Sequence, residues 1–325
     1  MTGYFPISVL FLPALRRAGL LALCLLALPC AMVPATSRAA ASPGHSGHCP
    51  DGTVLSVVAH TDDDLLFMNP DLDDSIRKGL CVRTVYVTAG DRGEGLPYLQ
   101  QRERGIMAAY ADMARTPDLW DTDGMRVDGR TLVRHTLRGD PRVQLIMLRI
   151  PDPWLGPGWG SLTPISRLES VPDTEVKSYG PHHESYTRSE LVDLLASLIQ
   201  SEHPQEVRTM DSTVQVAYQA LCWRCKGHDH PDHIASARLM NDAMAAAPGL
   251  YARVAYLDYP TQERAANLSD AEAERKTAIF MRYMKHDPHY CPDAARCSEV
   301  RGPEAKWVWR QYTVSNSRVT ATAVR

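Results

Sequence analysis

Residues 54–64 read VLSVVAHTDDD, in which a mostly apolar run is followed at once by a histidine and acidic residues. The β-branched composition of residues 54–59 indicates a strand buried on both faces, as in a parallel sheet. In open α/β sheets, binding and catalytic sites form outside the carboxyl ends of the strands. The polar residues that follow this strand are therefore the first candidates for a functional site.

Strand and helix patterns alternate along the rest of the chain. Further strands are expected at residues 82–88, 143–150, 206–210 and 254–259. Helices are expected at residues 72–79, 98–114, 187–199, 233–246 and 271–283. This alternation predicts an α/β fold of three layers, Rossmann-like, with a mostly parallel sheet.

Two stretches depart from this regular pattern. Residues 151–183 are rich in Pro, Gly, Ser and Trp, and we expect a long surface loop, a kind of segment that often carries function. The tail from residue 291 onward is less regular, and we expect Trp307, Trp309 and Tyr312 to pack on the body of the domain.

The first 41 residues have the pattern of a signal peptide. Arg16 and Arg17 precede an apolar run at residues 18–33, and small residues up to Ala41 follow it. A permanent membrane anchor is the alternative, but the run is shorter than the ~20 residues of a spanning helix and contains a proline. We therefore expect an exported protein, secreted or periplasmic, without a stable membrane span. Residues 42–325 are expected to form one domain, with its core at about 50–312.

The composition excludes two broad classes of protein. Hydrophobic residues make up 44% of the 325 residues, which predicts a packed core and not a disordered chain. There are 35 basic and 38 acidic residues, with no basic patch, so no nucleic-acid partner is expected.

The cysteines fit an oxidising compartment. Two of the eight lie in the predicted signal peptide, and an even number remains. Cys49 and Cys81 each precede one of two consecutive strands whose amino ends are expected to lie side by side, so we expect them to pair. Local disulfides are then expected for Cys222 with Cys225 and Cys291 with Cys297. A free Cys49 remains the alternative.

A second polar motif lies far along the chain, at residues 228–233, HDHPDH, where it begins a predicted helix. Together with His60, Asp62 and Asp63 it offers the imidazole and carboxylate ligands that suit a catalytic zinc. A zinc ion with an open position lowers the pKa of its bound water to ~7. A neighbouring carboxylate can then act as a general base.

These two motifs resemble the A-H-P-D-D and H-P-D-H signatures of the PIG-L/LmbE-like zinc-dependent de-N-acetylases. The resemblance extends roughly over residues 49–312, through TAGD at 88–91, Arg102 and VRTMD at 207–211. It implies an LmbE-like α/β fold. One position departs from the pattern, because Thr61 stands where the family has proline.

The resemblance implies a role for each matching residue. It implies that His60, Asp63 and His233 are zinc ligands, that Asp62 is the general base and that His230 stabilises the oxyanion. Arg102 matches a substrate-binding arginine. His228 stands where some relatives have a residue that aids the oxyanion, so a substrate contact and a plain surface position both stay open.

The implied function is removal of an N-acetyl group from an N-acetylglucosamine-type sugar or glycoconjugate. A non-catalytic carbohydrate-binding protein and an amidase for another N-acyl substrate are the alternatives. No G-x-S-x-G or H-E-x-x-H motif is present, which argues against a serine hydrolase or a zincin protease. We further expect Asp64 to be a solvated acid, Asp91 and Asp211 to orient ligands, and Trp154, Trp159 and Tyr179 to be candidates for stacking on sugars.

Overall fold

The run at residues 54–59 forms β1, Thr53–Val58, near the middle of an eight-stranded sheet. The computed structural model describes residues 49–156, 159–223, 225–314 and 319–320, and the predicted signal peptide lies outside them. The sheet order is β10-β9-β8-β1-β2-β5-β4-β3. Its inner strands are parallel, namely β1, β2 (Cys81–Thr88), β5 (Val143–Ile150), β8 (Glu206–Met210) and β9 (Ala252–Tyr256).

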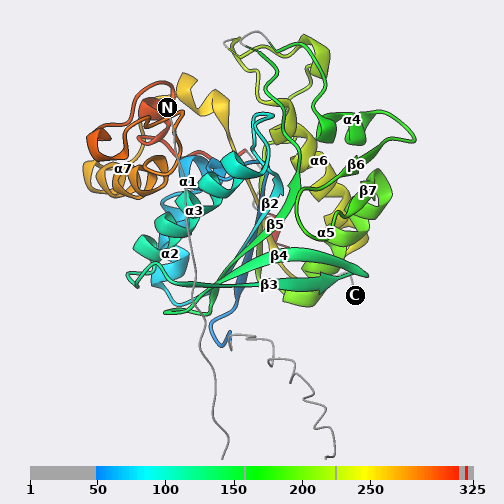
Figure 1. The fold of residues 1–325 in the computed structure, drawn as a ribbon, viewed down its shortest axis with the longest axis horizontal. Coiled ribbons are helices and arrows are strands. Elements are labelled where there is room, and N and C mark those ends of the chain that lie inside the picture. Colours follow the sequence, from blue (N-terminus) through cyan, green and yellow to red (C-terminus); the bar gives the residue numbers. More distant parts are fainter. Residues whose placement is uncertain (1–48, 157–158, 224, 315–318, 321–325) are drawn as a thin grey trace, which may run out of the picture. The chain divides into compact units, whose positions relative to one another are not determined.

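Helices cover both faces of this sheet, which confirms the predicted three-layer α/β fold (Figure 1). One face carries α1 (Asp63–Phe67), α2 (Asp71–Arg77), α3 (Leu96–Met113) and α7 (Asp270–Met284). The other face carries α4 (Pro164–Ser170), α5 (Arg188–Glu202) and α6 (Pro231–Ala246). Every residue of β1, β2 and β5 is buried, as expected for strands covered on both sides.

The edges of the sheet were not predicted. Strands β3 (Trp120–Val127) and β4 (Arg130–Leu137) form an antiparallel hairpin beside β5, and β10 (Val319–Thr320) lies antiparallel to β9. Most of β3 is exposed, and its sequence WDTDGMRV contains Asp and Gly, which are depleted in strands. The sequence of this hairpin therefore lacks the hydrophobic pattern that would predict its strands.

The segment predicted as a long loop is partly ordered into regular structure. It contains α4 and β6 (Glu175–Lys177), which pairs with β7 (Ser185–Thr187). Helix α5 begins as predicted, because Thr187 and Glu190 form a reciprocal capping box. The remaining short elements are α8 (Glu304–Trp307) and three 3₁₀ turns at Tyr218–Ala220, Tyr259–Glu263 and Ala294–Arg296.

Two further expectations concern burial. Trp307 is buried as expected, whereas Trp309 is 39% exposed. Asp64 is not a solvated acid: it is completely buried, and the hydroxyls of Tyr86 and Tyr110 donate to its Oδ2. Burial raises the pKa of Asp64 to about 7. The first turn of α1 directs this side chain into the core, which the acidic sequence alone does not reveal.

Three disulfides join the cysteine pairs expected from the sequence. They link Cys49 to Cys81, Cys222 to Cys225 and Cys291 to Cys297. Cys81 is the first residue of β2 and lies opposite Thr53 of β1, and its Cα is 5.5 Å from that of Cys49. Within the described residues, no helix is both long and apolar enough to cross a membrane.

Removal of the Cys49–Cys81 disulfide should lower the free energy of unfolding more than removal of the Cys222–Cys225 disulfide. The first closes a loop with a sequence separation of 32 and the second a loop with a separation of 3. The chain-entropy model gives roughly 3–4 kcal/mol for the long loop and about 2 kcal/mol for the short one. Chemical denaturation of Cys49→Ala and Cys225→Ala measures both losses. An alkylatable Cys49 thiol in the native, non-reduced protein would refute this pairing.

Lys276 should give the fold a distinct pH dependence. It is fully buried in α7, its Nζ donates to the carbonyl of Arg310 over 2.6 Å, and burial lowers its pKa to about 7. Between pH 7 and the ordinary lysine value, the unfolded chain binds a proton that the folded chain does not. Stability should therefore rise with pH in this window, by up to about 1.4 kcal/mol per pH unit from this group. The free energy of unfolding of the wild type should rise with pH more steeply than that of Lys276→Met, by this amount. Equal pH slopes for the two proteins, measured by denaturation across this range, would contradict the prediction.

Candidate functional site

The two polar motifs meet at one cavity beyond the carboxyl ends of the parallel strands. Strands β1 and β8 are neighbours, so the segments that follow them leave the sheet at the same edge. The cavity has a volume of about 290 Å³. Its lining includes four of the residues singled out in the sequence motifs, namely His60, Asp62, Asp63 and His230.

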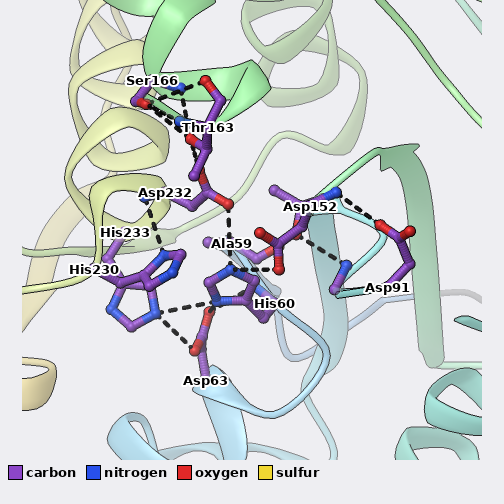
Figure 2. Close-up of polar contacts among 12 residues, drawn as sticks. Ala59, His60, Asp63, Asp91, Asp152, Thr163, Ser166, His230, Asp232 and His233 are labelled. Carbon is purple, nitrogen blue, oxygen red and sulfur yellow. Dashed lines mark hydrogen bonds and ion pairs between the residues drawn. The ribbon is translucent and has the colours of Figure 1, made fainter. Parts of the chain in front are cut away.

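His60, Asp63 and His233 direct three potential ligand groups toward one point (Figure 2). His60 Nδ1 lies 3.2 Å from His233 Nε2 and 3.2 Å from Asp63 Oδ2, and His233 Nε2 lies 3.1 Å from Asp63 Oδ1. Ligand atoms about 2.0–2.1 Å from a tetrahedral metal lie roughly 3.3 Å apart. The donor set and its spacing therefore fit a divalent metal such as zinc.

The outer nitrogens of both imidazoles face carboxylates. His233 Nδ1 lies 2.7 Å from Asp229 Oδ1, and His60 Nε2 lies 3.4 Å from Asp232 Oδ2. A metal-binding histidine commonly donates its second N–H to a carboxylate, which fixes the ring and its tautomer. Thr163, the N-cap residue of α4, in turn donates its hydroxyl to Asp232.

A second possible metal-binding group, His60, Asp152 and Asp232, lies on the opposite side of the His60 ring. Its contacts to His60 Nε2 are longer, at 3.5 Å for Asp152 and 3.4 Å for Asp232. We favour the side of Asp63 and His233, because it combines two imidazoles with one carboxylate at shorter distances, a ligand set typical of catalytic zinc sites.

The charges of the site favour a cation. Burial alone would raise the pKa of Asp63, but the imidazoles of His233 and His60 hold it well below its ordinary value. Burial lowers the pKa of His60, yet Asp63, Asp232 and Asp152 outweigh it and raise this pKa to about 10. A metal ion competes with protons for such nitrogens, and carboxylates that attract the proton attract the ion as well.

Asp62 precedes α1 and is held from two sides. Arg102 Nη2 lies 2.7 Å from its Oδ1, and the Tyr290 hydroxyl donates to its Oδ2 over 3.0 Å. Burial raises the pKa of Asp62, and Arg102 opposes this rise. The carboxylate therefore has a fixed orientation at the cavity and is separate from the Asp63 carboxylate.

Arg102 lines the cavity, but its N–H groups donate to other groups of the protein. Besides Asp62, it donates from Nη1 to the carbonyl of Gly90 and from Nε to the hydroxyl of Tyr283, each over 2.6 Å. The structure thus places Arg102 as a support for Asp62. Its expected contact with substrate remains a prediction.

His230 is the N-cap residue of α6, and its orientation defines its tautomer. Its Nδ1 accepts a hydrogen bond from the backbone N–H of Asp232 over 3.2 Å. Burial, together with His60, lowers its pKa well below the ordinary value, so the ring is neutral. The single ring proton is therefore on Nε2, which is available as a donor toward the cavity.

The structure does not bring His228 into this cavity. Its Nδ1 accepts the backbone N–H of Cys222 over 3.1 Å, and it is absent from the cavity lining. Tyr179 is also absent from this lining, and its hydroxyl donates to Asp91 Oδ2 over 3.2 Å. Trp154 and Trp159 do line the cavity.

Several site residues were missed or only partly recognised from the sequence. Asp152 lies two residues after the end of β5, and its N–H donates to Asp91 Oδ1 over 2.7 Å, so its position after a strand was a usable signal. Asp229 stands four residues before His233 in the second motif. Tyr290 and Glu304, which also line the cavity, lie in irregular sequence that gives no local signal.

Comparisons with known proteins agree with this geometry at the level of the family. The model of the family described as GlcNAc-PI de-N-acetylase (PIG-L) matches residues 55–244, more than half of the chain. No curated protein sequence matches the chain.

Solved structures with similar folds share little sequence with the chain. A zinc-inhibited teicoplanin deacetylase has 15% identity and a TM-score of 0.40, covering 73% of this chain and 84% of its own. N,N'-diacetylchitobiose deacetylase from Pyrococcus horikoshii has 14% identity and a TM-score of 0.40, covering 71% of this chain and 69% of its own. A 4-carboxy-2-hydroxymuconate hydratase from Pseudomonas putida has 13% identity and a TM-score of 0.39, covering 79% of this chain and 82% of its own. These likenesses carry no argument about activity, which rests on the family match.

Metal analysis of variants should separate the two possible ligand sets. Ala substitution of His60, Asp63 or His233 should abolish tight binding of about one zinc equivalent per chain, because each removes a ligand. Asp152→Asn should retain the ion. Asp229→Asn should weaken binding by about 10–100-fold, because it removes the carboxylate behind His233. Zinc titration followed by elemental analysis measures this, with the exposed His182→Ala as a control. Retention of zinc by Asp63→Ala and its loss by Asp152→Asn would reverse the assignment.

Proposed function

This chain belongs to the PIG-L family of GlcNAc-PI de-N-acetylases and is therefore an amide hydrolase. We propose that it is an exported zinc enzyme that removes the N-acetyl group from an N-acetylglucosamine-type sugar or glycoconjugate. The observation that carries this proposal is the placement of Asp62 and His230 at one cavity beside the convergent His60, Asp63 and His233.

We assign His60, Asp63 and His233 to hold the metal. When bound, a zinc ion would supply Lewis acidity and lower the pKa of water beside it. The choice of zinc follows from two imidazoles and one carboxylate, a ligand set typical of catalytic zinc sites.

Asp62 is suited to move the proton. Its two oxygens are fixed by Arg102 and Tyr290, so its remaining lone pairs can accept a proton from the attacking water and return it to the leaving nitrogen. Burial raises the pKa of Asp62, and Arg102 opposes this rise.

His230 is suited to stabilise the charge that develops on the acyl oxygen. Its Nδ1 is occupied by the backbone N–H of Asp232, which leaves the Nε2–H to donate to the oxyanion. Because the helix N-cap holds the ring in place, this donor needs no reorganisation during the reaction.

The cavity walls suit an amino sugar. Trp154, Trp159 and Trp223 contribute aromatic surface, and the Arg92 guanidinium lies 4.3 Å from the ring centre of Trp154. Aromatic faces pack against the apolar faces of sugar rings, and polar groups at the rim select hydroxyls.

Export follows from the predicted signal peptide at residues 1–41 and is in line with three disulfides. We place the mature enzyme, residues 42–325, outside the cell or in the periplasm, where its substrates would be glycans and glycoconjugates. An amidase for another N-acyl substrate is the alternative, and acetate-release assays would distinguish it from a de-N-acetylase.

Asp62→Asn should keep the metal and lose turnover by about 10²–10⁴-fold, because an amide cannot accept the proton of water. Acetate release from a panel of N-acetylated glycans, measured beside the bound zinc content, checks this. The variant Asp64→Asn, at a neighbouring acid outside the cavity, serves as the matched control. Near-normal turnover of Asp62→Asn would assign the base elsewhere, and wild-type protein with zinc but no hydrolysis of any acyl substrate would favour a binding protein.

A further inference from the structure

The hydroxyl of Tyr290 lies between two buried carboxyl groups. It is 3.0 Å from Asp62 Oδ2 and 3.3 Å from Glu304 Oε1, and all three residues line the cavity of the candidate site. A phenol has a single hydroxyl hydrogen, so it can donate to only one of these oxygens at a time. A hydrogen bond to the other carboxyl group requires a second proton.

The charges around the two carboxyl groups decide which of them holds this second proton. Asp62 has the guanidinium of Arg102 at 2.7 Å, and a neighbouring cation favours an ionised carboxylate. Within the described residues, no lysine, arginine or histidine forms an ion pair with Glu304. A buried carboxyl group without a cation favours its neutral form, so the second proton belongs to Glu304.

The groups that face Glu304 from other elements are acidic or neutral. They are Asp62 before α1, Asp287 and Tyr290 after α7, and Tyr259 in the 3₁₀ turn that contacts α8. Burial raises the pKa of Glu304 to about 7, and the charges of Asp62 and Asp287 add to this rise against hydrogen bonds from its own backbone N–H and from Tyr290. Below about pH 7 the neutral carboxyl group therefore prevails.

The segment that carries Tyr290 is anchored on both sides. The backbone N–H of Tyr290 donates to the carbonyl of Asp287 over 3.1 Å, and the next residue, Cys291, forms a disulfide with Cys297. Glu304 is the first residue of α8. The hydroxyl is therefore held between its two neighbours, and only the direction of its hydrogen is free to change.

We propose that Glu304 is a positioning residue for Asp62: its protonated carboxyl group donates to the hydroxyl oxygen of Tyr290 and thereby directs the Tyr290 hydrogen to Asp62 Oδ2. The inference rests on the proposed function for the role of Asp62 as the base. Arg102 then fixes one oxygen of the base and Tyr290 the other. When Glu304 loses its proton to solvent, its carboxylate competes for the single hydroxyl hydrogen, and Asp62 loses this support.

The test compares Glu304→Gln with Glu304→Leu. The glutamine amide has the shape of a neutral carboxyl group and can donate to Tyr290 at every pH, whereas leucine cannot. The measurement is kcat and KM for acetate release from N-acetylglucosamine oligosaccharides by the zinc-loaded proteins, from about pH 6 to about pH 9.

The kcat of Glu304→Gln should exceed that of Glu304→Leu by about fivefold across this range, as for one hydrogen bond, with similar KM. The wild type should follow the Gln variant at about pH 6 and approach the Leu variant at about pH 9. Because all three proteins share the other titrating groups, the ratios isolate Glu304. Equal kcat values for the Gln and Leu variants, or a wild-type ratio to the Gln variant that does not change with pH, would overturn the inference.

The Tyr290→Phe background shows whether Glu304 acts through the hydroxyl. In that background the Gln and Leu variants should have the same kcat, and a fivefold difference that persists there would overturn the positioning role. The matched control is Glu299→Gln, at an exposed acid of the same segment, which should keep the wild-type pH profile.

Infrared spectroscopy tests the position of the proton without any activity. The difference spectrum between zinc-loaded wild type and Glu304→Gln at about pH 6 should contain the carbonyl band of a protonated carboxyl group, and the band should disappear as the pH rises through about 7. Its presence supports the assignment even if no glycan is hydrolysed, and that result would count against the deacetylase proposal alone. Its absence at about pH 6 overturns the inference.

Discussion

The parallel pairing of β1 with β8 is the constraint on which the candidate site depends. The two strands are separated by about 150 residues of sequence but share hydrogen bonds from Val54 to Ser56. Their carboxyl ends therefore release the two polar motifs at the same edge, and His60 reaches His233 across the gap. Because β1 is packed on both faces along its whole length, a shift of this pairing would disrupt the packing of its side chains and is disfavoured.

The concentration of buried acid at this edge requires compensating positive charge. Asp62, Asp63, Asp152, Asp229 and Asp232 are all buried around His60 and His233. Burying a carboxylate without a partner is costly, so each has an imidazole, a guanidinium, a hydroxyl or a backbone N–H beside it. Arg102 provides the fixed cation at Asp62, and a divalent metal between His60, Asp63 and His233 would provide the second.

Aromatic side chains from the C-terminal part of the chain border the candidate metal site. Tyr259 follows β9 and Trp307 belongs to α8, yet their rings stack on each other and Tyr259 contacts His233. The C-terminal part of the chain, which lies beyond the region matched by the family model, thus supplies residues of the cavity. The walls of the candidate site are therefore built from these segments as well as from the two motifs.

The sequence by itself determined the layered α/β fold, the strands β1, β2, β5 and β8, and the two motifs that carry His60, Asp62, Asp63, His230 and His233. These features are encoded in contiguous residues, because burial on both faces of a strand, helix capping and motif chemistry are all local patterns. The tertiary structure decided what depends on distant contacts. Asp64 became a core residue because α1 faces Tyr86 and Tyr110, Arg102 became a support for Asp62, and Tyr290 reached that carboxylate from 228 positions away. The exposed hairpin β3–β4 and the C-terminal wall of the cavity have ordinary local sequences. The positions of these segments depend on how the packed elements contact one another, and the periodicity of a single segment does not predict such contacts.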